Sequence, residues 1–185
     1  MTSLSKICIH WTAGNYTPCQ TDINAYHYLF DDKGRIYLGK YKPEDNINCQ
    51  DGIYARHCGG GNTGCIGLSL CGMKGFTESK KQSSCPITQP QVESMCCMAA
   101  YLSNQYGILI NEKLVFTHYE FDQRKQKPEG KVDIVYISYL PNLQKERVGG
   151  YLRNKIEWYK QKLKQGKYKL QKKGNYYEFE SVSRV

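Results

Sequence analysis

The chain has 185 residues, of which 40% are hydrophobic, and this suffices for one ordinary domain with a buried core and a small appendage. No stretch approaches the roughly 18 consecutive apolar residues of a membrane-spanning helix, and the N-terminal residues lack a secretory signal, so we expect synthesis in the cytoplasm. The net charge of +9 is uneven, because residues 151–185 carry ten basic and three acidic side chains, a net charge of +7.

Short strands separated by turns are predicted in the first half of the chain. Asp32-Lys33-Gly34 has the composition of a hairpin turn between two of these strands. Asp22 is a candidate cap for a short helical turn before Ala25. Residues 42–64 are polar and glycine-rich, which indicates a long loop. The predicted strands cover residues 6–11, 26–30, 35–39 and 65–71.

One long helix is the clearest element of the second half. Thr88 and Gln91 have the spacing of a capping box, apolar residues then recur at helical spacing, and Gly107 stands where a helix terminator belongs. Strands mixed with helices indicate an α/β protein with one mixed central sheet flanked by helices. The other expected elements are a strand over residues 114–117, an amphipathic helix over 150–164 and a hairpin over 168–179.

Nine cysteines are an odd number, so at least one stays unpaired in a monomer. Without a signal peptide we expect reduced thiols that act mostly as small buried hydrophobic groups, although one or two disulfides can form after release into an oxidising space. No C-x-x-C pair occurs, which disfavours a zinc ribbon. The cysteines are Cys8, Cys19, Cys49, Cys58, Cys65, Cys71, Cys85, Cys96 and Cys97.

Two of the four histidines lie at the ends of apolar strands. They are His10, in the first predicted strand, and His118, directly after the strand over 114–117. Strand ends that open onto loops often carry functional residues. Together with Asp133 they supply the three N or O ligands of a catalytic zinc site, which leaves a fourth position for water. Lys131 lies two residues before Asp133, so both side chains face the same side of an extended segment.

Several pieces of the chain match one known family in order and in rough spacing. They are Ile9-His10-Trp11-Thr12-Ala13-Gly14, Ala25-Tyr26-His27-Tyr28-Leu29-Phe30, Asp32-Lys33-Gly34-Arg35-Ile36-Tyr37, Ala55-Arg56-His57 with residues 62–70, the helix over 88–107, Phe116-Thr117-His118 and Gly130-Lys131-Val132-Asp133. Over about residues 5–135 the chain resembles the zinc amidase family that includes phage lysozyme-type amidases and peptidoglycan recognition proteins. The ordered set of pieces is specific to this family.

The resemblance implies a reaction and a cofactor. It implies hydrolysis of the amide bond between N-acetylmuramic acid and L-alanine in peptidoglycan, with one Zn²⁺ per chain held by His10, His118 and Asp133. It also implies that Tyr26 lies beside the metal and that Lys131 stabilises the oxyanion, an effect of roughly 3–4 kcal/mol per donor. The general base stays open, because some relatives have a glutamate at the place of Tyr26.

Three further residues are implied to contact the substrate: His57, near the substrate groove, and Thr12 and Asn62. The chain also departs from the family pattern. His10 and Tyr26 are only sixteen positions apart, where relatives fit a full helix, and a shorter wall there predicts a more open groove.

The third metal ligand lies in an unusual interval. His118 and Asp133 are fifteen positions apart, and isoleucine replaces the family's usual proline after the third ligand. Asp122 and Glu120 are therefore alternative ligands.

Several functions fit these residues. The first is a lytic amidase, a phage endolysin or an interbacterial effector, that is made in the cytoplasm and acts on the cell wall or in the periplasm after release or delivery. The second is a cytosolic amidase that recycles soluble muropeptides, which need no basic segment. The third is a binding module that recognises peptidoglycan without cutting it, although the intact ligand set argues against this reading.

We divide the chain into a catalytic domain, residues 1–150, and a basic segment, residues 151–185, that either packs on the domain or binds the envelope. An anionic envelope polymer or lipid is the partner we favour for this segment, rather than nucleic acid, and we expect a monomer.

The G-x-G-x-x-G pattern at residues 59–64 is interpreted as a loop, because no helix follows it. A cysteine peptidase is disfavoured, because no cysteine lies in a recognisable peptidase motif.

Overall fold

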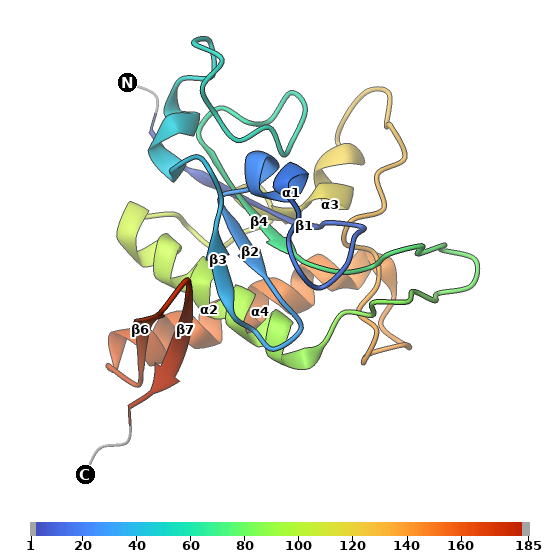
Figure 1. Ribbon diagram of the computed structural model, residues 1–185. Coiled ribbons are helices and arrows are strands. Elements are labelled where there is room, and N and C mark those ends of the chain that lie inside the picture. The colour runs from blue at the N-terminus through green and yellow to red at the C-terminus, as the bar shows by residue number, and fades with distance from the viewer. Residues whose placement is uncertain (1–2, 183–185) are drawn as a thin grey trace.

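Seven strands form one mixed β-sheet in the computed structural model, which describes residues 3–182 (Figure 1). Their order is β5-β1-β4-β2-β3-β7-β6. The first four strands in this order run parallel, and the remaining three continue in antiparallel pairing. The strands are β1 (Lys6–Trp11), β2 (Tyr28–Phe30), β3 (Ile36–Leu38), β4 (Cys65–Leu70), β5 (Val115–Thr117), β6 (Tyr168–Lys173) and β7 (Tyr176–Ser181).

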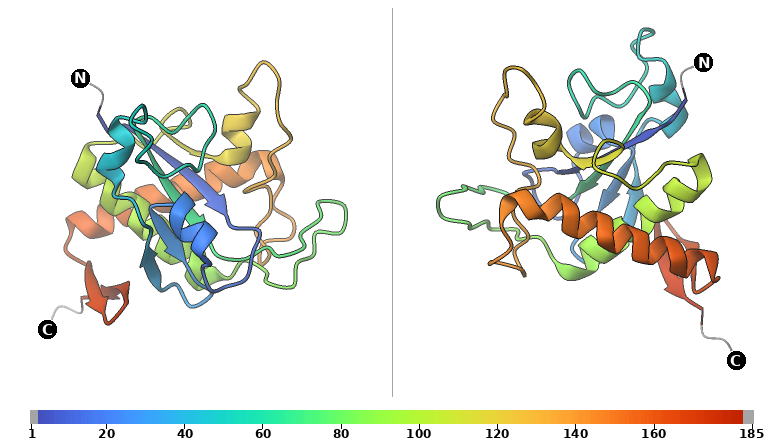
Figure 2. Two further views of the ribbon diagram at one scale, coloured as in Figure 1. Left: turned by 45° about the horizontal axis from the view of Figure 1, so that its top comes forward. Right: turned by 180° about the vertical axis from the view of Figure 1, so that it is seen from behind.

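Two long helices cover one face of the sheet, and the shorter helices lie on the other side. The long helices α2 (Gln89–Tyr106) and α4 (Lys145–Lys164) pack against each other, as the view from behind in Figure 2 shows. The short ones are α1 (Gln20–Ala25), α3 (His118–Asp122) and the 3₁₀ helix η1 (Pro43–Ile47), which interrupts the predicted long loop. The predicted α/β class, with a mixed sheet flanked by helices, is confirmed.

Strand β1 divides its side chains between the two faces of the sheet. Ile7, Ile9 and Trp11 belong to the apolar core that α2 and α4 cover. Successive side chains of a strand point to opposite faces, so Cys8 and His10 face the other side. Cys8 packs there in a separate, smaller cluster. The alternation therefore places a fully buried histidine on the face that carries the short helices.

Helix α2 keeps its predicted ends. The Thr88 hydroxyl accepts a hydrogen bond from the Gln91 backbone N–H, and the Gln91 side-chain oxygen accepts one from the Thr88 N–H. Gly107 ends the helix in the left-handed region, with φ of 69°. The predicted capping box and terminator are thus confirmed.

Helix α4 begins five residues before the predicted start at residue 150. Gly149 and Gly150 each disfavour a helix by about 1 kcal/mol relative to alanine. In the structure Val148 and Leu152 are both buried in the core, so the helix continues through the glycines. The boundary between residues 150 and 151 therefore falls inside α4.

The predicted C-terminal hairpin extends the sheet. β6 and β7 pair with each other, and β7 joins β3 where Tyr177 pairs with Ile36. Residues 183–185 of the basic segment lie outside the described residues.

All nine cysteines are free thiols, and six of them are buried. Within residues 3–182, no helix has both the length and the apolarity that crossing a bilayer requires.

Candidate metal centre

Two parallel strands bring the predicted histidines together. β1 and β5 are neighbours, with Ile9 paired to Thr117, so the next residues, His10 and His118, lie at the same end of the sheet. Ligand sites in such sheets gather at the carboxyl ends of the strands. The two imidazole ring centroids are 4.7 Å apart. The fold thus joins two residues that are far apart in the sequence.

Asp133 completes the cluster. Its Oδ2 lies 2.9 Å from Nδ1 of His10 and 3.0 Å from Nδ1 of His118. The three candidate ligand atoms all lie within 4.8 Å of one another. The Asp133 side chain is 14% exposed, so the cluster has one side open to solvent.

A hydrogen-bond chain behind His10 fixes which of its nitrogens carries the proton. The Cys65 carbonyl can only accept, so His57 Nε2–H donates to it over 3.2 Å. The His57 Nδ1 lone pair then accepts from His10 Nε2–H, also over 3.2 Å. Burial lowers the pKa of both imidazoles, which keeps them neutral. These two hydrogen bonds leave His10 Nδ1 without a proton, and this nitrogen faces Asp133.

His10 Nδ1 and the Asp133 carboxylate are arranged to bind a cation between them. Neutral His10 presents a lone pair at Nδ1, and the ionised Asp133 carboxylate only accepts hydrogen bonds, so no proton is left for their 2.9 Å contact. A divalent metal ion satisfies both groups and His118 Nδ1 at once. Two imidazoles and one carboxylate are a ligand set that catalytic zinc uses.

A second group of possible ligands shares His10. Cys8, His10 and His57 also lie with ligand atoms within 4.8 Å of one another, and all three are buried. A metal ion there would break the His10–His57 hydrogen bond and would have no open position for substrate. The group that contains Asp133 therefore suits catalysis better.

Of the two residues predicted to act beside the metal, Tyr26 lies next to His10, whereas Lys131 is paired with Glu129. The Tyr26 ring centroid is 5.2 Å from that of His10, and burial raises the phenol pKa, so the hydroxyl keeps its proton at neutral pH. Lys131 points to Glu129, with Nζ 3.2 Å from Oε2, and its side chain is 39% exposed. An ion pair so exposed to solvent breaks easily.

The two alternative ligands have other partners. Glu120 pairs with Arg153 of α4. The carboxylate of Asp122 accepts hydrogen bonds from the backbone N–H groups of Glu129 and Lys131, both at 2.9 Å, and so holds the loop that leads to Asp133. The role of Asp122 could not be predicted from residue type, because any residue except proline offers a backbone N–H.

The residues expected to contact substrate mostly contact the protein. His57 is only 6% exposed and lies behind His10. The Asn62 side-chain oxygen accepts from the backbone N–H groups of His57 and Cys58, at 3.1 and 2.8 Å. The Thr12 hydroxyl accepts from the Gly72 N–H at 3.1 Å. Contact of these three side chains with substrate stays a prediction.

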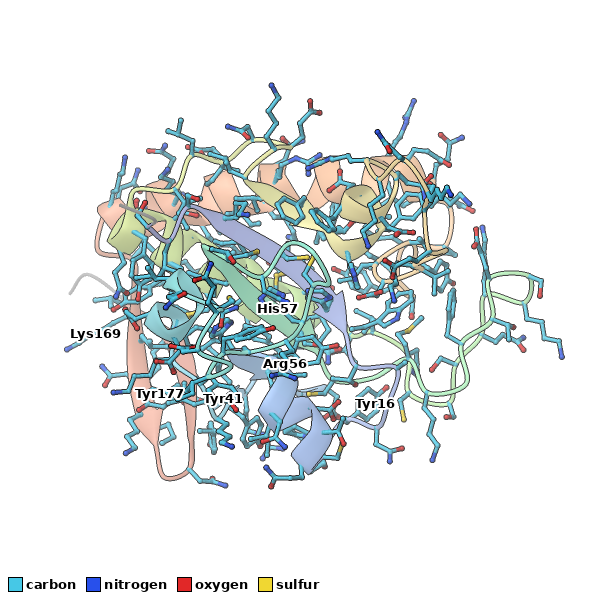
Figure 3. The ribbon with its side chains drawn as sticks, turned by 90° about the horizontal axis from the view of Figure 1, so that it is seen from above. Tyr16, Tyr41, Arg56, His57, Lys169 and Tyr177 are labelled. Carbon is cyan, nitrogen blue, oxygen red and sulfur yellow. The ribbon has the colours of Figure 1, made fainter. Side chains whose placement is uncertain are left out.

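A cavity of about 470 Å³ lies on the α1 side. Its lining includes Ala25, which precedes Tyr26 in the chain, and Arg56, which precedes His57. Figure 3 shows Arg56 between His57 and α1. The cavity also holds Lys40 with two tyrosines. Cations next to aromatic rings suit a ligand with carboxylates and apolar faces.

Two histidines at the ends of parallel strands, with the loop carboxylate of Asp133 beside them, form a ligand set that suits a single metal ion. The family model described as N-acetylmuramoyl-L-alanine amidase matches residues 1–130, and the chain belongs to this family. Lys131 and Asp133 directly follow the matched segment. A comparison with curated protein sequences gave no match.

Three solved structures resemble this chain at low sequence identity. The Ph2119 endolysin of the Thermus scotoductus MAT2119 bacteriophage is 16% identical, with a TM-score of 0.52 over 84% of this chain and 86% of that chain. The amidase LysC of Clostridium intestinale URNW is 17% identical, with a TM-score of 0.47 over 72% and 78%. Drosophila peptidoglycan recognition protein SD is 16% identical, with a TM-score of 0.44 over 64% and 71%.

Proposed function

We propose that the protein is a zinc-dependent amidase that hydrolyses the bond between N-acetylmuramic acid and L-alanine in bacterial peptidoglycan. One observation carries the proposal: in a chain of this family, Asp133 Oδ2 lies 2.9 Å from His10 Nδ1 and 3.0 Å from His118 Nδ1. Three protein ligands with one side open to solvent match a catalytic rather than a structural zinc site. They also argue against a module that binds peptidoglycan without cutting it.

Each side chain around the metal centre has a separate role in the proposed reaction. Zinc, when bound, polarises the scissile carbonyl and lowers the pKa of a water molecule towards about 7. The protonated Tyr26 hydroxyl donates a hydrogen bond at the reacting centre. Lys131 leaves its exposed pair with Glu129 and places its charge beside the developing oxyanion. His57 holds the His10 ring in the orientation and tautomer that ligation needs.

The cavity on the α1 side fits the stem peptide of the substrate. Peptidoglycan stems carry carboxylates, and Lys40 and Arg56 offer positive charge in this cavity. Arg56 also stacks on Tyr54, with its guanidinium carbon 5.1 Å from the ring centroid, which keeps the charge in place. We assign the stem peptide to this side of the metal centre.

The C-terminal lysines support action on an intact envelope. Lys164, Lys167, Lys169 and Lys172 are exposed, and no acidic side chain within residues 3–182 forms an ion pair with them. Such charge favours an anionic envelope polymer or lipid as a second partner. We therefore favour a lytic enzyme, an endolysin or an interbacterial effector that reaches the wall by release or delivery, over a recycling enzyme.

Digestion of intact sacculi, followed by mass spectrometry, tests the proposal. We expect peptides with a new N-terminal L-alanine and glycan strands with free muramic acid carboxyl groups. Removal of the metal with a chelator should abolish the cut, and Zn²⁺ should restore it. A parallel digestion of soluble muropeptides separates lysis from recycling. Activity that survives complete metal removal, or cleavage at another bond, would contradict the proposal.

A further inference from the structure

A bidentate ion pair joins helix α4 to the turn that carries His118. Arg153 Nη1 lies 2.9 Å from Glu120 Oε2, and Nη2 lies 2.9 Å from Oε1. Each side chain is only 17% exposed. Bidentate arginine–carboxylate pairs are the strongest and most directional ion pairs in proteins. Helix α4 also lies beyond the segment that the family model matches.

Glu120 lies two residues after His118 and closes the turn around it. Its Oε2 accepts a hydrogen bond from the Thr117 backbone N–H at 2.9 Å, and its own N–H donates to the Thr117 hydroxyl at 3.1 Å. The same arginine reaches the strand before the turn, because Arg153 Nη1 also donates to the Val115 carbonyl at 3.1 Å. One guanidinium thus holds both β5 and α3, on either side of His118.

The segment that carries His118 has little stability of its own. β5 has three residues and is an edge strand, and α3 has five residues, far fewer than an isolated helix needs. His118 also lacks the support that His10 receives, because its Nε2 is buried without a hydrogen-bond partner in the described structure. The position of the His118 ring therefore depends on its backbone.

A glycine in α4 lets the helix approach Glu120. A Cβ atom at Gly149 would lie 2.1 Å from Glu120 Oε1, where no atom fits. Any side chain there would push Glu120 away from Arg153. This close approach explains why α4 contains a glycine that its helical stability disfavours.

We propose that Arg153 is a positioning residue for the metal centre: through Glu120 it fixes the turn that presents His118 Nδ1. The proposal rests on the proposed function, since it concerns the same metal site. It makes α4 part of the catalytic apparatus, and it assigns to a residue of the basic segment a role other than envelope binding.

Zinc affinity of Arg153→Gln, measured by competition with a chromogenic chelator, tests the proposal. We expect the dissociation constant to rise about tenfold, as for other residues that orient metal ligands. Arg153→Lys keeps the charge but loses the bidentate contact, so it should fall between Arg153→Gln and the wild type. The matched control is Lys155→Gln, which removes an ion pair with Glu93 from the same helix. It should lose stability without losing zinc affinity.

Coupling between the partners separates positioning from general stability. Glu120→Gln should weaken zinc binding as Arg153→Gln does, and the double variant should show little further loss, because both changes break one contact. If Arg153→Gln does not fold, Gly149→Ala displaces Glu120 by a smaller change and should also weaken zinc binding. Wild-type zinc affinity in the folded Arg153 and Glu120 variants would overturn this proposal alone. A wild-type protein that binds no zinc would overturn the proposed function as well.

Discussion

His10 Nε2 lies 3.2 Å from His57 Nδ1, and His57 Nε2 lies 3.2 Å from the Cys65 carbonyl. His57→Ala removes the acceptor that fixes the His10 tautomer, so we expect zinc affinity to fall about 10- to 100-fold. His57→Asn keeps an acceptor near the place of Nδ1 and should recover part of the loss. Chelator competition measures both constants. A role in substrate contact alone would instead raise KM and leave zinc binding unchanged.

Lys131→Ala should keep zinc and lose turnover. The lysine charge acts on the developing oxyanion, and removal of one such donor lowers kcat by about 100- to 1,000-fold. The matched control is Lys125→Ala, because Lys125 lies in the same loop and also pairs with Glu129, at 2.6 Å. Release of soluble peptide from sacculi gives kcat for both variants. Equal rates in Lys131→Ala and Lys125→Ala would remove Lys131 from the reaction.

The free energy of unfolding should depend on pH through His27. Burial lowers the pKa of His27 to about 4, against the opposing effect of its contact with Asn46, whereas the unfolded chain has an ordinary value near 6.5. Between these values the unfolded state binds more protons. The contribution of His27 to the free energy of unfolding is therefore complete above about pH 6.5. It is lost as the pH decreases towards about 4, by roughly 3 kcal/mol in total.

Urea unfolding of the metal-free protein between about pH 7 and pH 4 measures this dependence. His27→Gln should be less stable at neutral pH and should show a flatter dependence, because the titrating group is gone. His27 hydrogen-bonds to Asn46 and Gly67 rather than to the metal ligands, so its loss isolates one titration. Parallel pH curves for the two proteins would contradict the prediction.

Exposed lysines of the C-terminal segment should control binding to the envelope. Replacing Lys164, Lys167, Lys169 and Lys172 with glutamine should weaken sedimentation with purified cell walls at low salt, and the difference should vanish at high salt. Four exposed lysines elsewhere provide the matched control: Lys74, Lys80, Lys113 and Lys127. Walls stripped of anionic polymer and vesicles of anionic lipid distinguish the partners. Equal loss in both variants would indicate net charge alone.

Truncation is a poor test of the basic segment, for a structural reason. Leu152 and Ile156 of α4 are buried in the main core, and Arg153 pairs with Glu120. A chain that ends at residue 150 should therefore fail to fold, as circular dichroism of the purified fragment would show. A folded, zinc-binding fragment would mean that α4 supports neither the core nor the site.

Local patterns in the sequence determined most of the secondary structure and the type of chemistry. Alternation in residues 6–11 places His10 on the face opposite the core, and the capping box at Thr88 sets the start of α2. Both patterns act between near neighbours, so they can be read without the fold. The start of α4 was predicted five residues too late, because the local pattern does not record the close approach of Gly149 to Glu120, a residue distant in the sequence.

Only the tertiary structure decided which groups meet. Asp133, rather than Asp122 or Glu120, faces both histidines, although all three carboxylates follow His118 closely in the sequence. The contact between His10 and Asp133 spans 123 positions, and the support of His118 by Arg153 comes from a helix beyond both. Such contacts depend on strand order, backbone carbonyls and close packing. Residue type and spacing record the donors, but not their partners.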